Sequence, residues 1–331
     1  MVVAGDVHQI RSGYHGIYTA VYLIAGKNLC LIDSGETETW RRRIIPYIRS
    51  IGRKPEEVKR IVHTHGHDDH CHGDLQIREQ TGAEIWISEL GAGFLGEPGS
   101  RAAWEERLYD GYLTEEEREA ICLGTDYRGP PRREEPIPVD HCYQPGDVLE
   151  AGPLRLEVVP AVGHTHDSCC LFEPERKLLF SGDAVNGEGT AFDDLPVFQD
   201  LEELPKTMKR LRDLEAELLL TAHPYLPFNE SVLEGEKGRD LMRRTSEINR
   251  RIGERIAELL SGAGEGGNAG DEHRELSTAE ISAKICGEFG PNRPQPRGHG
   301  TVRLNLVKLA REGKATARVA EDGVWWSWKG N

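Results

Sequence analysis

One short string constrains this chain more than any other feature: three histidines and two aspartates stand within six residues. The apolar pattern of residues 58–63 predicts a strand, and it runs directly into Thr64-His65-Gly66-His67-Asp68-Asp69-His70. Polar side chains at the carboxyl end of a strand lie where α/β proteins build their sites. Imidazole nitrogens and carboxylate oxygens suit Zn²⁺ and comparable ions. The string therefore predicts a metal site at the edge of a sheet, with further ligands from elsewhere.

Three later segments supply candidate ligands in the same structural setting. Each places a histidine or an aspartate just past an apolar stretch that predicts a strand. These residues are His164 after the strand 154–160, Asp183 after the strand 177–181, and His223 after the strand 217–222. A lone histidine is most often an ordinary surface residue, but that explanation does not account for the histidine string and three further ligand-bearing segments in one order.

The rest of the first 238 residues alternates predicted strands and helices, which indicates an α/β fold. Residues 18–25 and 28–33 predict a β-hairpin. The remaining elements are a helix from residue 37, a helix over 74–81, a strand over 84–88 and a helix near 201–214. Residues 89–136 are rich in Glu, Arg and Gly, and we interpret them as a partly helical insertion beside the site. Residues 1–238 are thus predicted to form one domain.

The carboxyl-terminal part has a different organisation. Apolar residues recur every three or four positions over 239–260, which predicts one amphipathic helix, and a Gly-rich linker follows up to residue 275. Residues 276–331 then show two helical patterns, 278–289 and 301–312, and a hairpin of 315–320 with 324–328. The order helix, helix, hairpin predicts a small winged-helix-like domain.

Charge and cysteine usage restrict the function classes. The chain has a net charge of −15, but residues 276–331 contain nine Lys and Arg and five Asp and Glu, a net of +4. The remainder carries −19, which disfavours strong non-specific binding of nucleic acid. Seven scattered cysteines disfavour a disulfide framework. We find neither an apolar run long enough for a membrane span nor a secretory signal, so the expected location is the cytoplasm.

The ligand-bearing motifs together resemble the metallo-β-lactamase superfamily over about residues 7–230. The matching motifs are the HxHxDH string at 65–70, the Gly-His-Thr at 163–165, Asp183 and His223. The resemblance implies an αββα sandwich that binds two divalent ions, for which Zn²⁺ is the first expectation and Fe or Mn the alternatives. It implies that one ion is held by His65, His67 and His164. It implies that the other is held by Asp69, His70 and His223, with Asp183 between the two ions.

The same resemblance implies a mechanism. Two ions close together can share a hydroxide that acts as the nucleophile. Asp69 would orient this hydroxide and shuttle its proton, which makes Asp69 the expected catalytic residue. Asp33 in Leu31-Ile-Asp-Ser-Gly matches the superfamily's early aspartate and is expected to lie behind the ligands, orienting His65. Asp183 is often absent from true β-lactamases, so its presence favours the wider hydrolase branch.

Three function classes stay open on the sequence. The layout with a winged-helix-like tail is similar to β-lactamase-like hydrolases that include an endoribonuclease, and glyoxalase II is a more distant relative. The first class is hydrolysis of a thioester, ester or lactone, with a small molecule or an acyl carrier as substrate. The second is a single-strand-specific endoribonuclease, which would make RNA the partner. The third is a nucleic-acid-binding regulator with a metal-binding sensor. A homodimer is also open, whereas a membrane partner is not expected.

Overall fold

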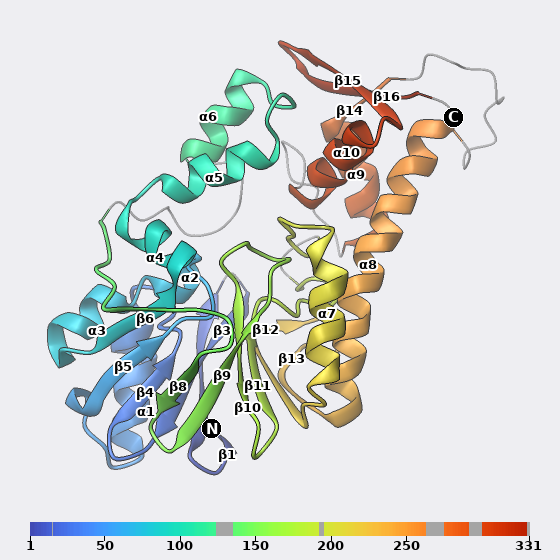
Figure 1. Cartoon of the computed structure of the whole chain (residues 1–331). Helices are drawn as coiled ribbons and strands as arrows, with labels where there is room; N and C mark the ends of the chain where they lie inside the picture. The colour runs from blue at the N-terminus through green and yellow to red at the C-terminus, as the bar shows by residue number, and fades with distance from the viewer. Residues whose placement is uncertain (15, 124–134, 192–194, 263–274, 291–299, 330–331) are drawn as a thin grey trace.

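Two β-sheets face each other at the centre of the protein (Figure 1). The computed structural model describes residues 1–14, 16–123, 135–191, 195–262, 275–290 and 300–329. Helices cover the outer face of each sheet, which makes the four-layer αββα sandwich that the sequence predicts.

The first sheet has seven strands, which pair in the order in which they occur along the chain. They are β1 (Val2–Ala4), β2 (Val7–Tyr14), β3 (Ile17–Ala25), β4 (Leu29–Ile32), β5 (Val58–Val62), β6 (Glu84–Ser88) and β7 (His141–Tyr143). Neighbours from β1 to β4 are antiparallel, and neighbours from β4 to β7 are parallel. The carboxyl ends of β4 and β5 therefore share one edge, and this brings the segments that follow them together.

The second sheet has six strands in the order β13-β12-β11-β10-β9-β8. They are β8 (Val148–Ala151), β9 (Leu154–Pro160), β10 (Cys169–Glu173), β11 (Leu178–Gly182), β12 (Leu218–Tyr225) and β13 (Glu230–Glu234). Only β11 and β12 pair in parallel among these strands, so their carboxyl ends point the same way. Asp183 directly follows β11, and His223 lies close to the carboxyl end of β12.

Apolar side chains from both sheets form the inner core. The rings of Tyr22 from β3 and Phe180 from β11 meet edge to face with their centroids 5.4 Å apart. The hydroxyl of Tyr22 donates to the carbonyl of Thr221 at 2.7 Å, which fixes the two sheets against each other. Burial of such a side chain contributes about 1.5–3 kcal/mol.

Two helical layers complete the sandwich (Figure 1). The segments after β4 and β5 cover the first sheet and bury Trp40, Ile48 and Ile77 against it. They are η1 (Trp40–Ile44, a π-helical turn), α1 (Ile45–Ser50), η2 (Pro55–Glu57), α2 (Asp68–Cys71) and α3 (Asp74–Thr81). The second sheet is covered by α7 (Glu203–Asp213) and α8 (Gly235–Ser261), which bury Leu204 and Leu241.

The insertion and the carboxyl-terminal elements lie above the same end of the sandwich (Figure 1). The insertion contains α4 (Glu89–Gly96), α5 (Ser100–Leu108) and α6 (Glu115–Leu123). The carboxyl-terminal elements are β14 (Leu276–Ser277), α9 (Thr278–Phe289), α10 (Gly300–Arg311), β15 (Ala315–Ala320) and β16 (Gly323–Trp328). The two parts touch: the rings of Tyr112 and Trp326 stack at 5.5 Å, and Arg303 pairs with Glu117 at 2.7 Å.

Most predicted elements are confirmed. The hairpin is β3 and β4, and the structure keeps the predicted bounds of α3 and β6. The long amphipathic helix is confirmed as α8 but begins four residues earlier than predicted. Strands β1, β2, β7, β8, β13 and β14 were missed, because each is short or contains polar residues.

The predicted tail elements are present as α9, α10 and the β15–β16 hairpin. The winged-helix assignment and the domain boundaries stay predictions, and most of the Gly-rich linker lies outside the described residues. In the described part of the chain, no helix is both long enough and apolar enough to span a membrane.

Candidate metal centre

All seven predicted ligands come together at one end of the two sheets. They fall into two groups whose ligand atoms lie within 4.8 Å of one another: His65, His67, His164 and Asp183 in one, and Asp69, His70 and His223 in the other. Each group draws on both sheets. The 65–70 segment follows β5 of the first sheet. His164 and Asp183 follow strands of the second sheet, and His223 lies within β12 near its carboxyl end.

Three ring nitrogens converge in the first group. Nδ1 of His67 lies 3.0 Å from Nε2 of His65 and 3.0 Å from Nε2 of His164. On its far side, Nδ1 of His164 lies 2.9 Å from the carbonyl oxygen of Val197, so this nitrogen is the donor and Nε2 is free to bind a cation. Burial, together with nearby positive groups, lowers the pKa of His65 and of His67 well below the ordinary value. Neutral imidazoles are the form that binds a metal.

The second group combines a carboxylate with two imidazoles. Oδ2 of Asp69 lies 3.0 Å from Nε2 of His223 and 3.7 Å from Nε2 of His70. Nδ1 of His223 lies 3.1 Å from the carbonyl oxygen of Tyr18, which orients the ring. Burial opposes the charged ring, but Asp183 and Asp69 outweigh it and raise the pKa of His223 to about 10. Without metal, the His223 ring is therefore protonated near neutral pH, and the positive charge lies beside Asp69 and Asp183, where a metal cation would also be stabilised.

Asp183 lies between the groups. Its Oδ2 is 3.4 Å from Nε2 of His70, 3.5 Å from Nε2 of His223 and 3.7 Å from Nε2 of His164. Nε2 of His70 and Oδ1 of Asp183 are buried without a hydrogen-bond partner among the described residues. Buried polar atoms without partners are costly, and cations bound by these donors would relieve that cost. The residues present therefore fit a two-metal site.

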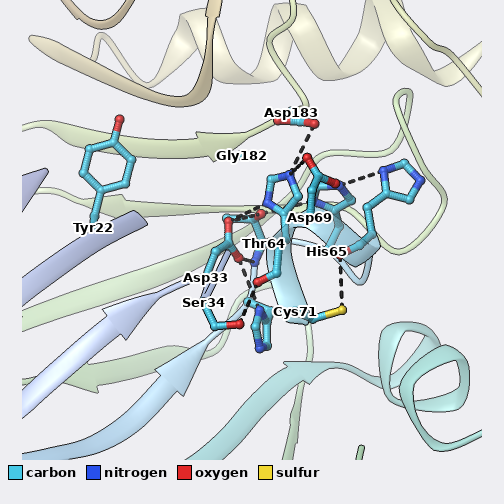
Figure 2. A network of polar contacts seen from close by, with 12 residues as sticks. Tyr22, Asp33, Ser34, Thr64, His65, Asp69, Cys71, Gly182 and Asp183 are labelled. Carbon is cyan, nitrogen blue, oxygen red and sulfur yellow. Dashed lines mark hydrogen bonds and ion pairs between the residues drawn. The ribbon is translucent and has the colours of Figure 1, made fainter. Parts of the chain in front are cut away.

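Asp33 lies behind this cluster, but it orients a different histidine from the one predicted (Figure 2). The expected contact with His65 is wrong: Oδ2 of Asp33 lies 2.9 Å from Nδ1 of His70. Nδ1 of His65 instead lies 3.2 Å from the hydroxyl of Thr64. Thr64 in turn donates its backbone N–H and its hydroxyl to Asp33, at 2.8 and 3.0 Å. The carboxylate therefore reaches His65 only through Thr64.

A second buried histidine extends this network away from the ligands. Nε2 of His63 lies 2.8 Å from Oδ2 of Asp74, and its Nδ1 lies 3.4 Å from Oδ1 of Asp33. Burial opposes a charge here, but Asp74 and Asp33 raise the pKa of His63 to about 9. His70 and His63 in turn hold the pKa of Asp33 below its usual range, against the effect of burial.

A glycine allows the two sheets to approach so closely at the site. Gly182, directly before Asp183, has a φ of +51°, and a Cβ there would lie 2.3 Å from Oγ1 of Thr64. Any side chain would therefore force apart the segments that carry Asp183 and His65. The glycine is a requirement of the site's geometry.

Sequence reasoning missed the buried polar residues around the ligands. His63 and Asp74 flank the histidine string, and a signal existed, since a histidine at the end of an apolar strand needs a partner. Asp167 is an acidic residue only three positions after His164, close to the Gly-His-Thr motif, which was a second signal. Its partner Arg101 lies in the insertion, at 3.3 Å, and no local pattern marks it.

Comparisons with known proteins agree with this geometry. The family model described as the metallo-beta-lactamase superfamily matches residues 16–223. The acyl-coenzyme A thioesterase MBLAC2 of Gallus gallus is 31% identical over 153 residues, which cover 46% of this chain and 50% of that protein. The hydroxyacylglutathione hydrolase GloC of Haemophilus influenzae is 28% identical over 171 residues, which cover 51% and 67%. The chain thus spans between half and two thirds of the length of these two relatives.

A solved structure extends the likeness to nearly the whole chain. A metallo-β-lactamase family protein from Thermus thermophilus superposes with a TM-score of 0.67 at 19% identity, covering 99% of this chain and 100% of the other. This likeness concerns the fold alone. The family match covers more than half of the chain and contains all seven predicted ligand positions. The chain belongs to the metallo-β-lactamase superfamily, whose members are metal-dependent hydrolases.

Proposed function

We propose that this chain is a hydrolase that holds two divalent ions on its two ligand groups and cleaves a thioester, with esters and lactones as related substrates. The observation that carries the proposal is the position of Asp183, whose Oδ2 lies 3.4–3.7 Å from imidazole nitrogens of both groups. The donor set of imidazoles and carboxylates suits Zn²⁺ first, and Fe or Mn could occupy similar ligands.

Two bound ions would supply an activated water near neutral pH and polarise the scissile carbonyl. The chain's own residues hold and orient the reacting centre. His65, His67 and His164 provide neutral nitrogens, and Asp183 connects the two groups. Because Val197, Tyr18 and Asp33 fix three of the ligand rings from behind, little reorganisation is needed when an ion binds.

Asp69 is the residue that we assign to proton transfer. Its Oδ2 lies 3.0 Å from Nε2 of His223. We propose that the other carboxylate oxygen, Oδ1, accepts the proton. Burial disfavours its ionisation, but His70 and His223 outweigh burial and lower the pKa of Asp69. The carboxylate is therefore ionised at neutral pH, so it can accept a proton and return it to the leaving group.

The thioester is favoured over RNA by the relatives and by the tail. The names of the two relatives refer to acyl-coenzyme A and to hydroxyacylglutathione, both of which are thioesters. Helix α10, which a nucleic-acid-binding regulator would have to expose, is packed against the protein: residues 301–307 are all buried. Its basic side chains also have protein partners, since Arg303 pairs with Glu117 at 2.7 Å and Lys308 with Glu312 at 3.1 Å. For this reason we do not propose the regulator function.

The test is a substrate screen of the Zn²⁺-loaded protein at two salt concentrations. The panel contains an acyl-coenzyme A, an S-acylglutathione, a lactone, a β-lactam and single-stranded RNA. We expect thioester turnover that responds little to salt, because a small substrate releases few counterions. RNA cleavage that weakens steeply with salt, without thioester turnover, would replace this proposal with the endoribonuclease.

The matched variants are Asp69→Ala and Asp68→Ala. The first should lower kcat by about 10²–10⁴-fold. The second removes the neighbouring carboxylate, which lies 3.3 Å from His72 rather than in a ligand group, and should keep most of the activity. Equal activity of both variants would contradict the role of Asp69, and full activity after chelation would contradict the proposed function itself.

A further inference from the structure

We infer that Asp167, held by Arg101 of the insertion, is a positioning residue that sets the spacing between the loop of His65 and His67 and the loop of His164. Neither residue belongs to a ligand group. The inference rests on the proposed metal site, and it assigns to the insertion a role in positioning the ligands of that site.

One carboxylate connects the two ligand-bearing loops. Asp167 is three residues after His164, and its side chain is fully buried. Its Oδ2 accepts the backbone N–H of Gly66, the residue between His65 and His67, at 2.8 Å. Its own carbonyl oxygen accepts the hydroxyl of Ser88, at the end of β6, at 2.9 Å. Asp167 is therefore fixed to the first sheet at two points.

The carboxylate is neutralised from the insertion. Nη2 of Arg101, on α5, lies 3.3 Å from the same Oδ2 of Asp167. The guanidinium also lies over the ring of Phe94, with its central carbon 4.4 Å from the ring centroid. The side chain of Arg101 is only 11% exposed. Each charge would be costly to bury without the other, so α5 and the ligand loops are held as one unit.

Gly66 shows how tightly this unit is packed. A Cβ at Gly66 would lie 2.8 Å from Nη2 of Arg101 and 3.4 Å from Oδ2 of Asp167. The guanidinium therefore occupies the space that a side chain would need between two ligand histidines. A displacement of α5 would move this backbone, and with it the Nδ1 of His67, which faces both other imidazoles of its group.

An ordinary structural ion pair is the competing explanation, and metal binding distinguishes the two. Groups that orient metal ligands typically change metal affinity by about 10–100-fold when they are replaced. A pair that only stabilises the fold would change the unfolding of the metal-free protein and leave the affinity of the folded site unchanged. The decisive readout is therefore the site itself, measured without any substrate.

The experiment compares wild type with Asp167→Ala, Asp167→Asn, Arg101→Met and the double variant Arg101→Met/Asp167→Ala. Zn²⁺ affinity is measured by competition with a chelator, and the visible absorption of the Co²⁺-loaded protein reports the ligand geometry. Thermal unfolding of the metal-free proteins is recorded in parallel. The matched control is Arg255→Met, which removes a partly exposed ion pair with Glu288 far from the ligands in sequence.

We expect Asp167→Ala to bind at least one of the two ions about 10–100-fold less strongly and to alter the Co²⁺ spectrum. Asp167→Asn should lose less metal affinity than Asp167→Ala, because an amide oxygen can still accept the N–H of Gly66. Arg101→Met should act in the same direction, and the double variant should be no worse than Asp167→Ala, since both residues act through one contact. The control should match wild type.

Wild-type affinity and spectrum in all Asp167 and Arg101 variants would overturn the inference, even if their metal-free proteins unfold more easily. If Asp167→Ala does not fold, the metal affinity and Co²⁺ spectrum of Asp167→Asn and Arg101→Met decide whether the inference holds. A wild-type protein that binds no metal would remove both the inference and the proposed function. A wild-type protein that binds metal and hydrolyses thioesters, beside variants with unchanged sites, would remove the inference alone.

Discussion

Oδ2 of Asp33 lies 2.9 Å from Nδ1 of His70, so a buried carboxylate holds this imidazole from behind. The same side chain accepts two hydrogen bonds from Thr64, the residue directly before the histidine string. Asp33 itself has a φ of +59°, which aspartate and asparagine tolerate better than most residues. One side chain thus orients a ligand ring and fixes the start of the ligand loop.

This relationship predicts the result of Asp33→Asn, which keeps the unusual backbone conformation. The amide removes the charge that orients His70, so we expect Zn²⁺ affinity to fall by about 10–100-fold. Chelator competition measures it. Asp6→Asn, at a surface pair with Arg176, is the control and should bind as wild type does. Unchanged affinity in Asp33→Asn would show that packing alone holds the ring.

Gly182→Ala should damage both stability and activity. A Cβ would lie 2.3 Å from Oγ1 of Thr64, and the φ of +51° is unfavourable for alanine. We expect a loss of roughly 2–4 kcal/mol in the free energy of unfolding. Gly52→Ala separates the two causes, because Gly52 has a φ of +74° but nothing within 4 Å of its Cβ position. If both variants lost the same amount, the close approach to Thr64 would carry no cost.

The pair of His63 and Asp74 predicts a pH-dependent contribution to stability. The folded protein raises the pKa of His63 from 6.5 to about 9, with Asp74 as the first attractive cause against burial. The stabilisation is therefore fully present below pH 6.5 and is lost as the pH rises through about 9. We expect Asp74→Asn to be roughly 2–3 kcal/mol less stable than wild type at about pH 6, with a smaller difference at about pH 10. Denaturant unfolding of the metal-free proteins at both pH values measures it, and a difference that grows with pH would contradict the assignment.

Arg303→Met should destabilise the contact between the tail and the insertion. The side chains of Arg303 and Glu117 are 6% and 14% exposed, so Glu117 would lose its cationic partner at a position largely shielded from water. The expected cost is about 3–5 kcal/mol. Arg255→Met breaks a more exposed pair and should cost below about 1 kcal/mol. Thermal unfolding compares the two, and equal midpoints would mean that the contact contributes nothing.

That the seven predicted ligands lie together could be predicted from the sequence, because each follows a local signal. His65, Asp183 and His223 all stand at the end of an apolar strand, and parallel strands bring such ends together. The partner of Asp33 could not be predicted in the same way. His65 and His70 are both near in sequence, and the choice between them depends on the positive φ of Asp33 and on the packing of α2.

The contacts of the insertion were beyond local reasoning for a different reason. Arg101 lies on a short helix with no marked apolar face, and its partner Asp167 is 66 residues away. A buried charge has no periodic pattern, so only the tertiary structure shows that it is paired. The same holds for Arg303, which the sequence presents as one of three ordinary charges on a helix.

Each ligand group contains residues from both sheets, and this has a consequence for the order in which the chain can acquire its site. During synthesis the first sheet emerges with His65, His67 and His70 but without the residues that complete either group. The first group is whole only after Asp183 has been made, and the second only after His223. Neither group can therefore be complete before the strands of the second sheet have been made, so the two-metal site is among the last features that the chain can acquire.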